Sequence, residues 1–516
     1  MKAATRNSWA SEIELKFAVS PEAAGSLLNQ PPLRMARDLG ERCIDSRYFD
    51  TAGGRLQKDG IALRVRSLGD SFVQTAKMFD PAGHTAFRLE REDPVAGPRP
   101  CAALLRQAAG SGYADIADGD LVPAFRTRIN RRVLMLEDQG RGSRVEVAID
   151  NGFVEASGAR EPLSEIELEL MEGGIGDLYS LALGMHRQTP LAIEAFTKSQ
   201  RGYALGGGLP PAWSKAGAFV LDPGTSLDDA IALTLGRCYG HWMNNQAAAL
   251  DGRDIEGVHQ MRVALRRLRA ALELFAPWFD DGSQASFTAD VKWIAASLAA
   301  VRDLDVLSHV TLAPLREAFR GDGDLARLEE CIGNRRKEAC RRLVLAVGSP
   351  RYTSAVLTLG QWIHERGWSA GDPVLDGPAE PHVSEALSEV YAQVLSRGEG
   401  FDTLSPVARH QLRLRIKRLR YAIQFVGPVF RGTGPWLQAL SDLQDVLGAA
   451  NDAAVAGDLI RSCTGSASGK RPLARARGLV AGWWAARGEH LESDARARWR
   501  TFTELEPFWR TAPVHP

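Results

Sequence analysis

The chain changes its hydrophobic periodicity at one cluster of helix- and strand-breaking residues, Gly206–Gly207–Gly208–Leu209–Pro210–Pro211. Before this cluster, short runs of β-branched and aromatic residues alternate with Gly- and Asp-rich turns, a pattern typical of an all-β barrel or sandwich. After it, long amphipathic runs rich in Ala, Leu and Arg predict helices as far as the end of the sequence. A chain of 516 residues is also too long for one compact core. We therefore expect two domains, residues 8–206 and 221–510, joined by a linker at 207–220.

The second part of the chain contains an internal repeat. His259–Arg269 reads HQMRVALRRLR, and His410–Arg420 reads HQLRLRIKRLR. Downstream, LAAVRD at 298–303 is answered by LGAAND at 447–452, in the same order and at nearly the same separation. A Pro/Gly-rich break at Gly371–Val383 separates the two copies. The repeat predicts a duplicated helical domain, with halves at about 221–370 and 384–510.

Charged and apolar residues alternate in several predicted strands of the first part. Glu12, Glu14 and Lys16 are separated by Ile13, Leu15 and Phe17. Successive side chains of a strand point to opposite faces, so the three charges share one face. A single strand of this kind is explained by a solvated surface. The same pattern recurs, however, at Arg64 and Arg66, at Arg88, Glu90 and Glu92, and at Glu165, Glu167 and Glu169. Such a series favours a barrel with a charged lumen.

A lumen that carries both carboxylates and basic side chains suits phosphoryl transfer. Acidic side chains offer the oxygen ligands that Mg²⁺ or Mn²⁺ prefers. Arginine and lysine neutralise phosphate oxygens, arginine often in a bidentate manner. The reaction needs mainly positioning and charge stabilisation, which this combination supplies without a covalent nucleophile.

The ordered series of motifs resembles the CYTH superfamily, the triphosphate tunnel metalloenzymes, over residues 10–205. The similar segments are Glu12-x-Glu14-x-Lys16, Tyr48–Phe49–Asp50–Thr51, Leu63–Arg64–Val65–Arg66, Lys77, Arg88-x-Glu90-x-Glu92, Glu165-x-Glu167-x-Glu169 and Lys198-x-x-Arg201–Gly202–Tyr203. The resemblance implies an eight-stranded antiparallel β-barrel tunnel that cleaves the terminal phosphate of a triphosphate.

The resemblance also assigns roles to individual residues. The implied metal ligands are Glu12, Glu14, Glu165 and Glu167. The implied triphosphate-binding residues are Lys16, Arg64, Arg66, Lys77, Arg128, Lys198 and Arg201. Lys16, Glu14 and Glu167 would be catalytic, and a water activated by the metal and a carboxylate would attack. Arg126 and Arg131 lie close to Arg128 in the same strand region, so the choice among these three arginines stays open.

The repeated helical segments each place basic residues on one stripe. At 100° per residue, His259, Arg262, Arg266 and Arg269 share a helical face, and His410, Arg413, Lys417 and Arg420 reproduce it. Solvated helix faces usually mix acidic and basic residues, because like charges at this spacing repel. Neither stripe contains a carboxylate, which favours an anion-binding role. Arg267 and Arg418 lie off the stripes, and the two histidines are interpreted as phosphate-contacting or packing residues rather than metal ligands.

The pattern His-x2-Arg-x3-Arg/Lys-Arg-x-Arg resembles the CHAD domain, over about residues 220–510. This resemblance implies an all-α domain of two four-helix bundles related by a pseudo-twofold axis. It further implies a non-catalytic module that binds inorganic polyphosphate through these stripes. The whole chain is then expected to have an α+β multidomain architecture.

The function expected from both parts is metal-dependent hydrolysis of inorganic triphosphate, combined with polyphosphate binding. Three alternatives remain: a thiamine triphosphatase or adenylate cyclase of the same superfamily, a non-catalytic protein whose barrel only senses triphosphate, and a nucleic-acid-binding protein. The stripes lack the aromatic, Asn and Gln residues suited to base readout, which speaks against the last. Six cysteines without a CxxC pair, and no apolar run of membrane-spanning length, predict a cytoplasmic protein that could gather at polyphosphate granules.

Overall fold

The computed structural model describes residues 10–79, 87–217, 221–279, 282–368, 371–464 and 472–510. The chain forms two compact units. Unit 1 comprises Met1–Gly217, Tyr239–Met261 and Ala346–Glu365, and unit 2 comprises Ala218–Cys238, Arg262–Leu345 and Arg366–Pro516. The antiparallel sheet therefore shares its unit with two short helical segments from beyond the linker.

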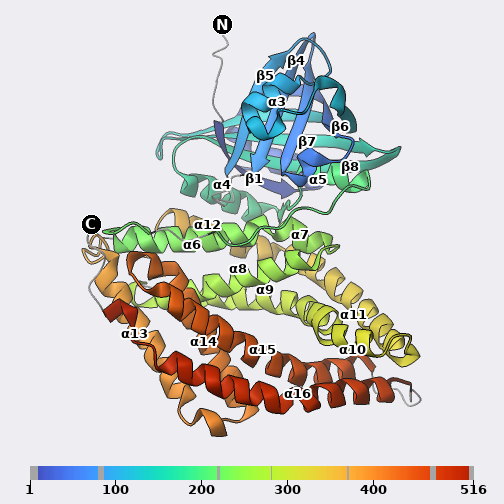
Figure 1. The fold of residues 1–516 in the computed structure, drawn as a ribbon. Coiled ribbons are helices and arrows are strands. Elements are labelled where there is room, and N and C mark those ends of the chain that lie inside the picture. Colours follow the sequence, from blue (N-terminus) through green and yellow to red (C-terminus); the bar gives the residue numbers. More distant parts are fainter. Residues whose placement is uncertain are drawn as a thin grey trace. The chain divides into compact units, whose positions relative to one another are not determined.

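The sheet of unit 1 has nine antiparallel strands in the order β5-β4-β3-β2-β6-β7-β8-β1-β9 (Figure 1). Their bounds are β1 (Ala10–Ala18), β2 (Arg37–Thr51), β3 (Ile61–Leu68), β4 (Ser71–Phe79), β5 (Phe87–Val95), β6 (Leu121–Asp138), β7 (Ser143–Ala156), β8 (Ala159–Glu172) and β9 (Ala192–Ile193). Strand β1 also pairs with β5, but only over Ala10–Ile13, so the sheet is not closed along its whole length. The expected antiparallel architecture is confirmed, and the expected count of eight strands is corrected by the two-residue strand β9.

Strand β7 runs through a segment whose composition favours a turn. Asp150–Asn151–Gly152 has the composition of a turn, yet β7 continues through it to Ala156 while paired with β6. A Cβ atom at Gly152 would lie 2.0 Å from the carbonyl oxygen of Arg128. The close approach of β6 therefore explains why a glycine occupies position 152, and the chain does not turn at this point.

Five helices belong to the sheet region: α1 (Pro21–Leu28), α2 (Arg55–Lys58), α3 (Ala102–Ala109), α4 (Ile175–Gln188) and α5 (Lys198–Leu205). Helix α5 packs on β6, β7 and β8. A Cβ atom at Gly202 would lie 2.1 Å from the ring of Phe125, so only glycine permits this contact. Phe125 in turn stacks on Tyr48 at 4.3 Å and meets Tyr203 edge-on at 5.0 Å. This aromatic cluster holds α5 against the sheet.

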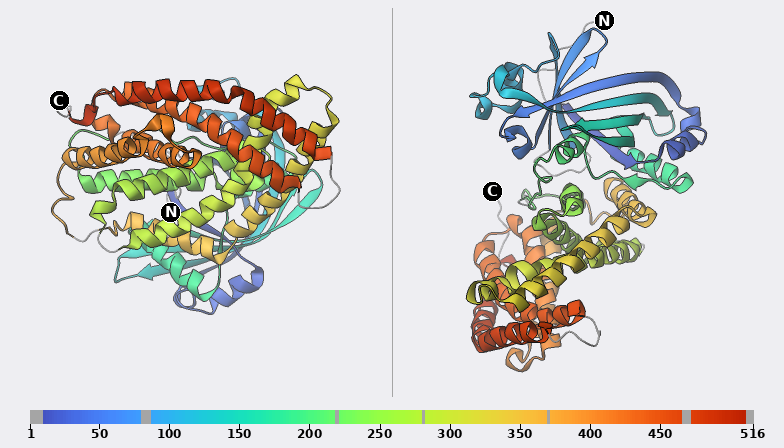
Figure 2. Two further views of the ribbon diagram at one scale, coloured as in Figure 1. Left: turned by 90° about the horizontal axis from the view of Figure 1, so that it is seen from below. Right: turned by 90° about the vertical axis from the view of Figure 1, so that its right-hand side faces the viewer.

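The remainder of the chain is helical. Its helices are α6 (Leu227–Asn244), α7 (Gln246–Asp251), α8 (Ile255–Leu274), α9 (Ser283–Val306), α10 (Ala313–Ala318), α11 (Gly323–Val347), α12 (Pro350–His364), α13 (Ala379–Gly398), α14 (Pro406–Val426), α15 (Thr433–Thr464) and α16 (Pro472–Thr503). In unit 2, α13, α14, α15 and α16 pack each on the next in sequence (Figure 2). In unit 1, α12 packs on α4 of the sheet region.

Local sequence sets several of the helix starts. Helices α1, α12 and α14 each begin at a Ser-Pro pair, in which the serine side chain caps a backbone N–H and the proline occupies the first turn. Helix α13 begins at Ala379, so the predicted break at Gly371–Val383 ends five residues earlier than expected. Pro381 lies in the first turn of α13, where a missing N–H has no intrahelical partner to lose.

Contacts between α8 and α14 reveal the predicted duplication. Arg267 of α8 donates a 2.7 Å hydrogen bond to Gln424 of α14, and Arg418 of α14 binds Glu273 of α8. Arg418 and Gln424 are the repeat equivalents of Arg267 and Glu273. A contact that is repeated with its partners exchanged is the signature of a twofold relation between the two halves.

Among the described residues, none of the helices combines the length and the apolar character needed to cross a bilayer.

Candidate functional site

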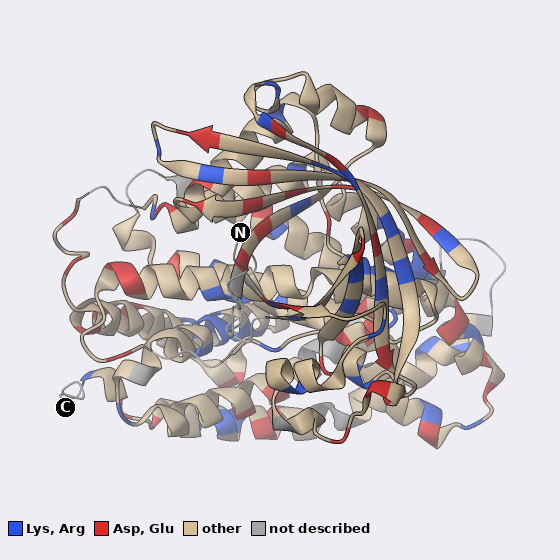
Figure 3. Cartoon of the chain, turned by 90° about the horizontal axis from the view of Figure 1, so that it is seen from above, with Lys and Arg blue, Asp and Glu red and all other residues tan. Residues whose placement is uncertain are grey.

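The charged faces of the strands in unit 1 line one cavity of about 290 Å³. Acidic and basic residues follow one another along the strands in Figure 3. Seven of the predicted site residues line this cavity: Glu12, Lys16, Arg64, Arg66, Lys77, Glu167 and Lys198. The cavity wall also includes Arg42, Tyr48, Glu90, Glu92, Arg131, Glu146 and Glu169.

Lys198, at the start of α5, lies among three carboxylates. Its Nζ is 2.8 Å from Oδ2 of Asp150 and 2.9 Å from Oε1 of Glu167, and it also contacts Glu165. Burial alone would lower the pKa of Lys198, but Glu165, Glu167 and Asp150 raise it well above its usual value. The ammonium group is therefore held charged at this end of the cavity.

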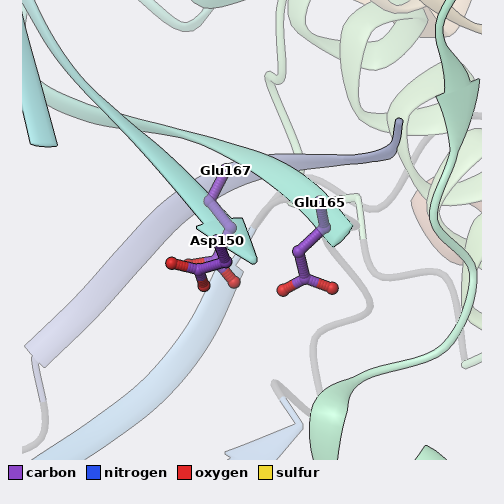
Figure 4. A group of neighbouring side chains, drawn as sticks. All are labelled: Asp150, Glu165 and Glu167. Carbon is purple, nitrogen blue, oxygen red and sulfur yellow. The ribbon is translucent and has the colours of Figure 1, made fainter. Parts of the chain in front are cut away.

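Asp150, Glu165 and Glu167 form a buried acidic group whose oxygens lie within 4.8 Å of one another (Figure 4). Burial disfavours the charged form of Glu167, but Lys16, Lys198 and Arg131 hold its pKa well below the usual range. Burial raises the pKa of Glu165 despite Lys198, and its Oε2 is buried with no hydrogen-bond partner. This set of oxygen donors fits Mg²⁺ or Mn²⁺ in kind, although Lys198 and Arg131 now balance its charge.

The two glutamates of β1 lie apart from that group. Oε2 of Glu12 is 2.7 Å from Nζ of Lys77, which also lies 2.8 Å from Glu90. Oε1 of Glu14 is 3.5 Å from Nζ of Lys16, and the same ammonium is 2.7 Å from Glu167. Thus the four predicted metal ligands divide between two places on the same sheet, and Lys16 lies between Glu14 and Glu167.

Glu169 marks a region of excess negative charge. Burial, followed by the charges of Glu12, Glu146 and Glu14, raises the pKa of Glu169 to about 7. Glu169 pairs across the strands with Glu14 on one side and Glu146 on the other. A cation bound here would relieve this repulsion.

The arginines of β3 form a region of excess positive charge. Arg64, burial and Arg131 together lower the pKa of Arg66 to about 10. Arg64 is 3.3 Å from Glu90. Such crowding of guanidinium groups in a buried place is relieved by an anion.

Two predicted phosphate-binding residues do not line the cavity. Arg128 is exposed on the face of β6 opposite to that of Arg131, and Arg131 takes the cavity position, 2.6 Å from Asp150. Arg201 points into a different cavity, where it binds Glu161 and lies 3.6 Å from Glu194. The structure thus places both residues outside this cavity, and Asp150 and Glu146 are acidic residues of the site region that the sequence analysis did not single out.

The two basic stripes lie on α8 and α14. All eight residues, His259, Arg262, Arg266, Arg269, His410, Arg413, Lys417 and Arg420, are half-buried, so they do not form an ordinary solvated helix face. The second repeated segment adjoins them: Asp303 of α9 is 3.8 Å from Arg262, and a Cβ atom at Gly448 of α15 would lie 3.2 Å from Arg413.

The stripes of the two halves influence each other. Burial lowers the pKa of Arg262 against the opposing charge of Asp303, and Arg266, Arg302 and Arg413 lower it further. Arg413 belongs to the other half, so the two stripes converge on one surface of concentrated positive charge.

Sequence and structure comparisons agree with these observations. Residues 10–203 match the family model of the CYTH domain, and residues 233–461 match that of the CHAD domain. An inorganic triphosphatase of Haemophilus influenzae is 27% identical over 203 residues, which cover 38% of this chain and 55% of that protein. The chain therefore matches only about half the length of this relative.

A solved CHAD domain from the plant Ricinus communis is 30% identical to this chain, with a TM-score of 0.51. The match covers 59% of this chain and 99% of the plant domain. The chain therefore belongs to the CHAD-domain proteins and carries a CYTH domain at residues 10–203.

Proposed function

We propose that the CYTH domain hydrolyses inorganic triphosphate to diphosphate and phosphate, with Mg²⁺ or Mn²⁺ bound. The observation that carries this proposal is a single cavity with two charge imbalances, an acidic one at Glu169 and a basic one at Arg66. A metal cation and a chain of phosphates would relieve both at once. The relative from Haemophilus influenzae supports the same reaction.

The metal is proposed to bind among Glu12, Glu14, Glu165 and Glu167, with Asp150 and Glu169 beside them. The carboxylate oxygens suit Mg²⁺ or Mn²⁺, and the unbonded Oε2 of Glu165 leaves one buried acceptor available. Bound metal would supply positive charge to the phosphate oxygens in the transition state.

Lys16, Arg64, Arg66, Lys77, Arg131 and Lys198 are proposed to bind the phosphate oxygens, and Arg131 replaces Arg128 in this set. Water would attack the terminal phosphorus while the bond to its bridging oxygen breaks, and diphosphate leaves with the bonding electrons. A carboxylate near Glu14 would accept the proton of the water. Lys16 lies between Glu14 and Glu167 and would neutralise the charge that develops on the phosphoryl group.

Phosphate release tests this proposal. Inorganic triphosphate, thiamine triphosphate, ATP and long-chain polyphosphate are offered with and without Mg²⁺ or Mn²⁺. We expect metal-dependent release mainly from inorganic triphosphate. Preference for thiamine triphosphate, or cyclisation of ATP, would assign a different substrate. No turnover of any of them would identify the barrel as a sensor and overturn the proposal.

A second function is proposed for the CHAD domain, residues 221–510: reversible binding of inorganic polyphosphate on the converging stripes of α8 and α14. The half-burial of eight basic or histidine residues supports an anion there, and so does the pKa of Arg262, which burial and the charges of Arg266, Arg302 and Arg413 lower. Filter binding of labelled polyphosphate across a salt series, with single-stranded RNA as competitor, tests this. We expect strong salt dependence and little competition by RNA. Equal competition would instead indicate a general polyanion-binding surface.

A further inference from the structure

The helix face that carries the basic stripe of α8 continues beyond Arg269. One helical turn later, on the same face, lies Glu273, which is exposed. The equivalent position at the end of the α14 stripe holds Gln424. The two halves of the duplicated surface therefore end differently, one in a carboxylate and the other in a neutral amide.

Glu273 forms ion pairs with two arginines of the other half. Its Oε1 accepts a 3.2 Å hydrogen bond from Nη1 of Arg415 and a shorter one from Nη1 of Arg418. Both arginine side chains are 30% exposed and Glu273 is 44% exposed. Burial lowers the pKa of Arg418 against the opposing charge of Glu273, and Arg415 and the stripe residue Arg269 lower it further. The corner formed by Arg269, Arg415, Arg418 and Glu273 is thus continuous with the α8 stripe.

The equivalent corner of the other half is built differently. Arg267 is 6% exposed and lies over the rings of Phe425 and Tyr421, at 5.1 and 5.7 Å from their centroids. It donates to Gln424. The residues equivalent to these two aromatics are Leu274 and Ala270, so Arg418 lacks such an aromatic platform and keeps its exposure. Arg267 is therefore a packing residue, whereas Arg418 is accessible to a ligand.

We propose that Arg415 and Arg418 form an additional phosphate-binding subsite at the end of the α8 stripe, and that Glu273 competes with phosphate for it. This inference rests on the proposed binding of polyphosphate by the CHAD domain. A carboxylate and a phosphate need the same guanidinium donors, and a partly exposed ion pair is weak enough to be displaced. Glu273 also repels any phosphate that reaches this corner, so it limits the affinity of the whole surface.

The test compares Glu273→Gln with the matched variant Gln424→Glu in the full-length protein, using labelled inorganic polyphosphate. We expect Glu273→Gln to bind about tenfold more tightly at low salt, with a steeper dependence on salt, because two more cations become available. Adding Arg415→Ala and Arg418→Ala to Glu273→Gln should remove the gain. Gln424→Glu should weaken binding. Triphosphate turnover should be unchanged in every variant, and an unchanged far-ultraviolet circular dichroism spectrum serves as the control for folding of the helical domain.

Unchanged or weaker binding by Glu273→Gln would overturn the inference. The same is true if the gain survives the loss of both arginines. Failure of the proposed polyphosphate binding gives a different result, namely no binding by the wild-type protein. In that case, binding gained by Glu273→Gln alone would still support the competing role of Glu273, and its absence would reject both.

Discussion

The cavity of unit 1 and the helical basic surface both carry concentrated positive charge, but they balance it in different ways. In the cavity, Lys16, Lys77 and Lys198 each lie within 3 Å of a carboxylate. On α8 and α14, the stripes contain no acidic residue before Glu273, and Asp303 is 3.8 Å from Arg262. Close carboxylates fix the orientation of the cations and offer ligands for a metal, as the proposed hydrolysis requires. A surface with few acids attracts a polyanion strongly and releases it when salt increases.

The largest effect should come from removing charge in the cavity or directly beside it. Lys16→Ala and Glu14→Ala are expected to lower triphosphate turnover by at least about 10³-fold, because each removes a group aligned with the reacting phosphate. Polyphosphate binding should stay within about twofold of the wild type. Parallel assays of phosphate release and filter binding check both statements. Comparable losses in the two assays would mean that the cavity and the helical surface do not act separately.

The reverse variant should affect binding alone. Arg262→Ala combined with Arg413→Ala is expected to weaken polyphosphate binding by about 100-fold at low salt and to flatten its salt dependence, because charge-assisted contacts from both halves are lost. Triphosphate turnover should persist. Arg341→Ala with Arg342→Ala is the matched control, since both side chains are exposed and lie near Glu338. A loss as large in this control would show that only net charge matters.

The acidic end of the cavity predicts that metal binding depends on pH. The pKa of Glu169 is raised to about 7, so Glu169 is largely protonated at pH 6 and charged at pH 8. Metal affinity, measured by calorimetry, should therefore rise about tenfold between these values, and metal binding should release a proton. In Glu169→Gln the rise should be much smaller.

The same group affects stability without metal. Folding raises the pKa of Glu169 from its ordinary value of 4.5 to about 7. The folded protein therefore becomes less stable as the pH increases through this range. The melting temperature of Glu169→Gln should exceed that of the wild type by a few degrees at pH 8 and equal it below pH 4.5. Equal melting temperatures at both pH values would contradict the raised pKa.

Alternation in the sequence predicted the faces of most cavity residues, because a short strand leaves only two possible orientations. Glu12, Arg64, Arg66 and Glu167 line the cavity as this pattern requires. Likewise, the repeat predicted the correspondence of α8 with α14. Asp150 was missed because it precedes Asn151–Gly152, where the sequence favours a turn. Pairing over the full length of β6 and β7 overrides that local preference.

The exchanged contacts between α8 and α14 could not be predicted from the sequence, for a different reason. Helical periodicity places Arg267 and Arg418 off the stripes but does not say what they touch. Their partners lie on another helix, and the difference between a buried Arg267 and a partly exposed Arg418 depends on the aromatic rings at 421 and 425.

The smallest effect is expected at Arg128, and it tests the strand register directly. A shift of one residue moves a side chain to the opposite face of a sheet, so Arg128 and Arg131 cannot both face the cavity. Arg128→Ala should leave triphosphate turnover within about twofold, because Arg128 is exposed outside the cavity. Arg131→Ala, its matched variant, removes a cation 2.6 Å from Asp150 and should reduce turnover strongly. A strong loss in Arg128→Ala with little in Arg131→Ala would place β6 one residue out of register, and with it the basic wall of the cavity.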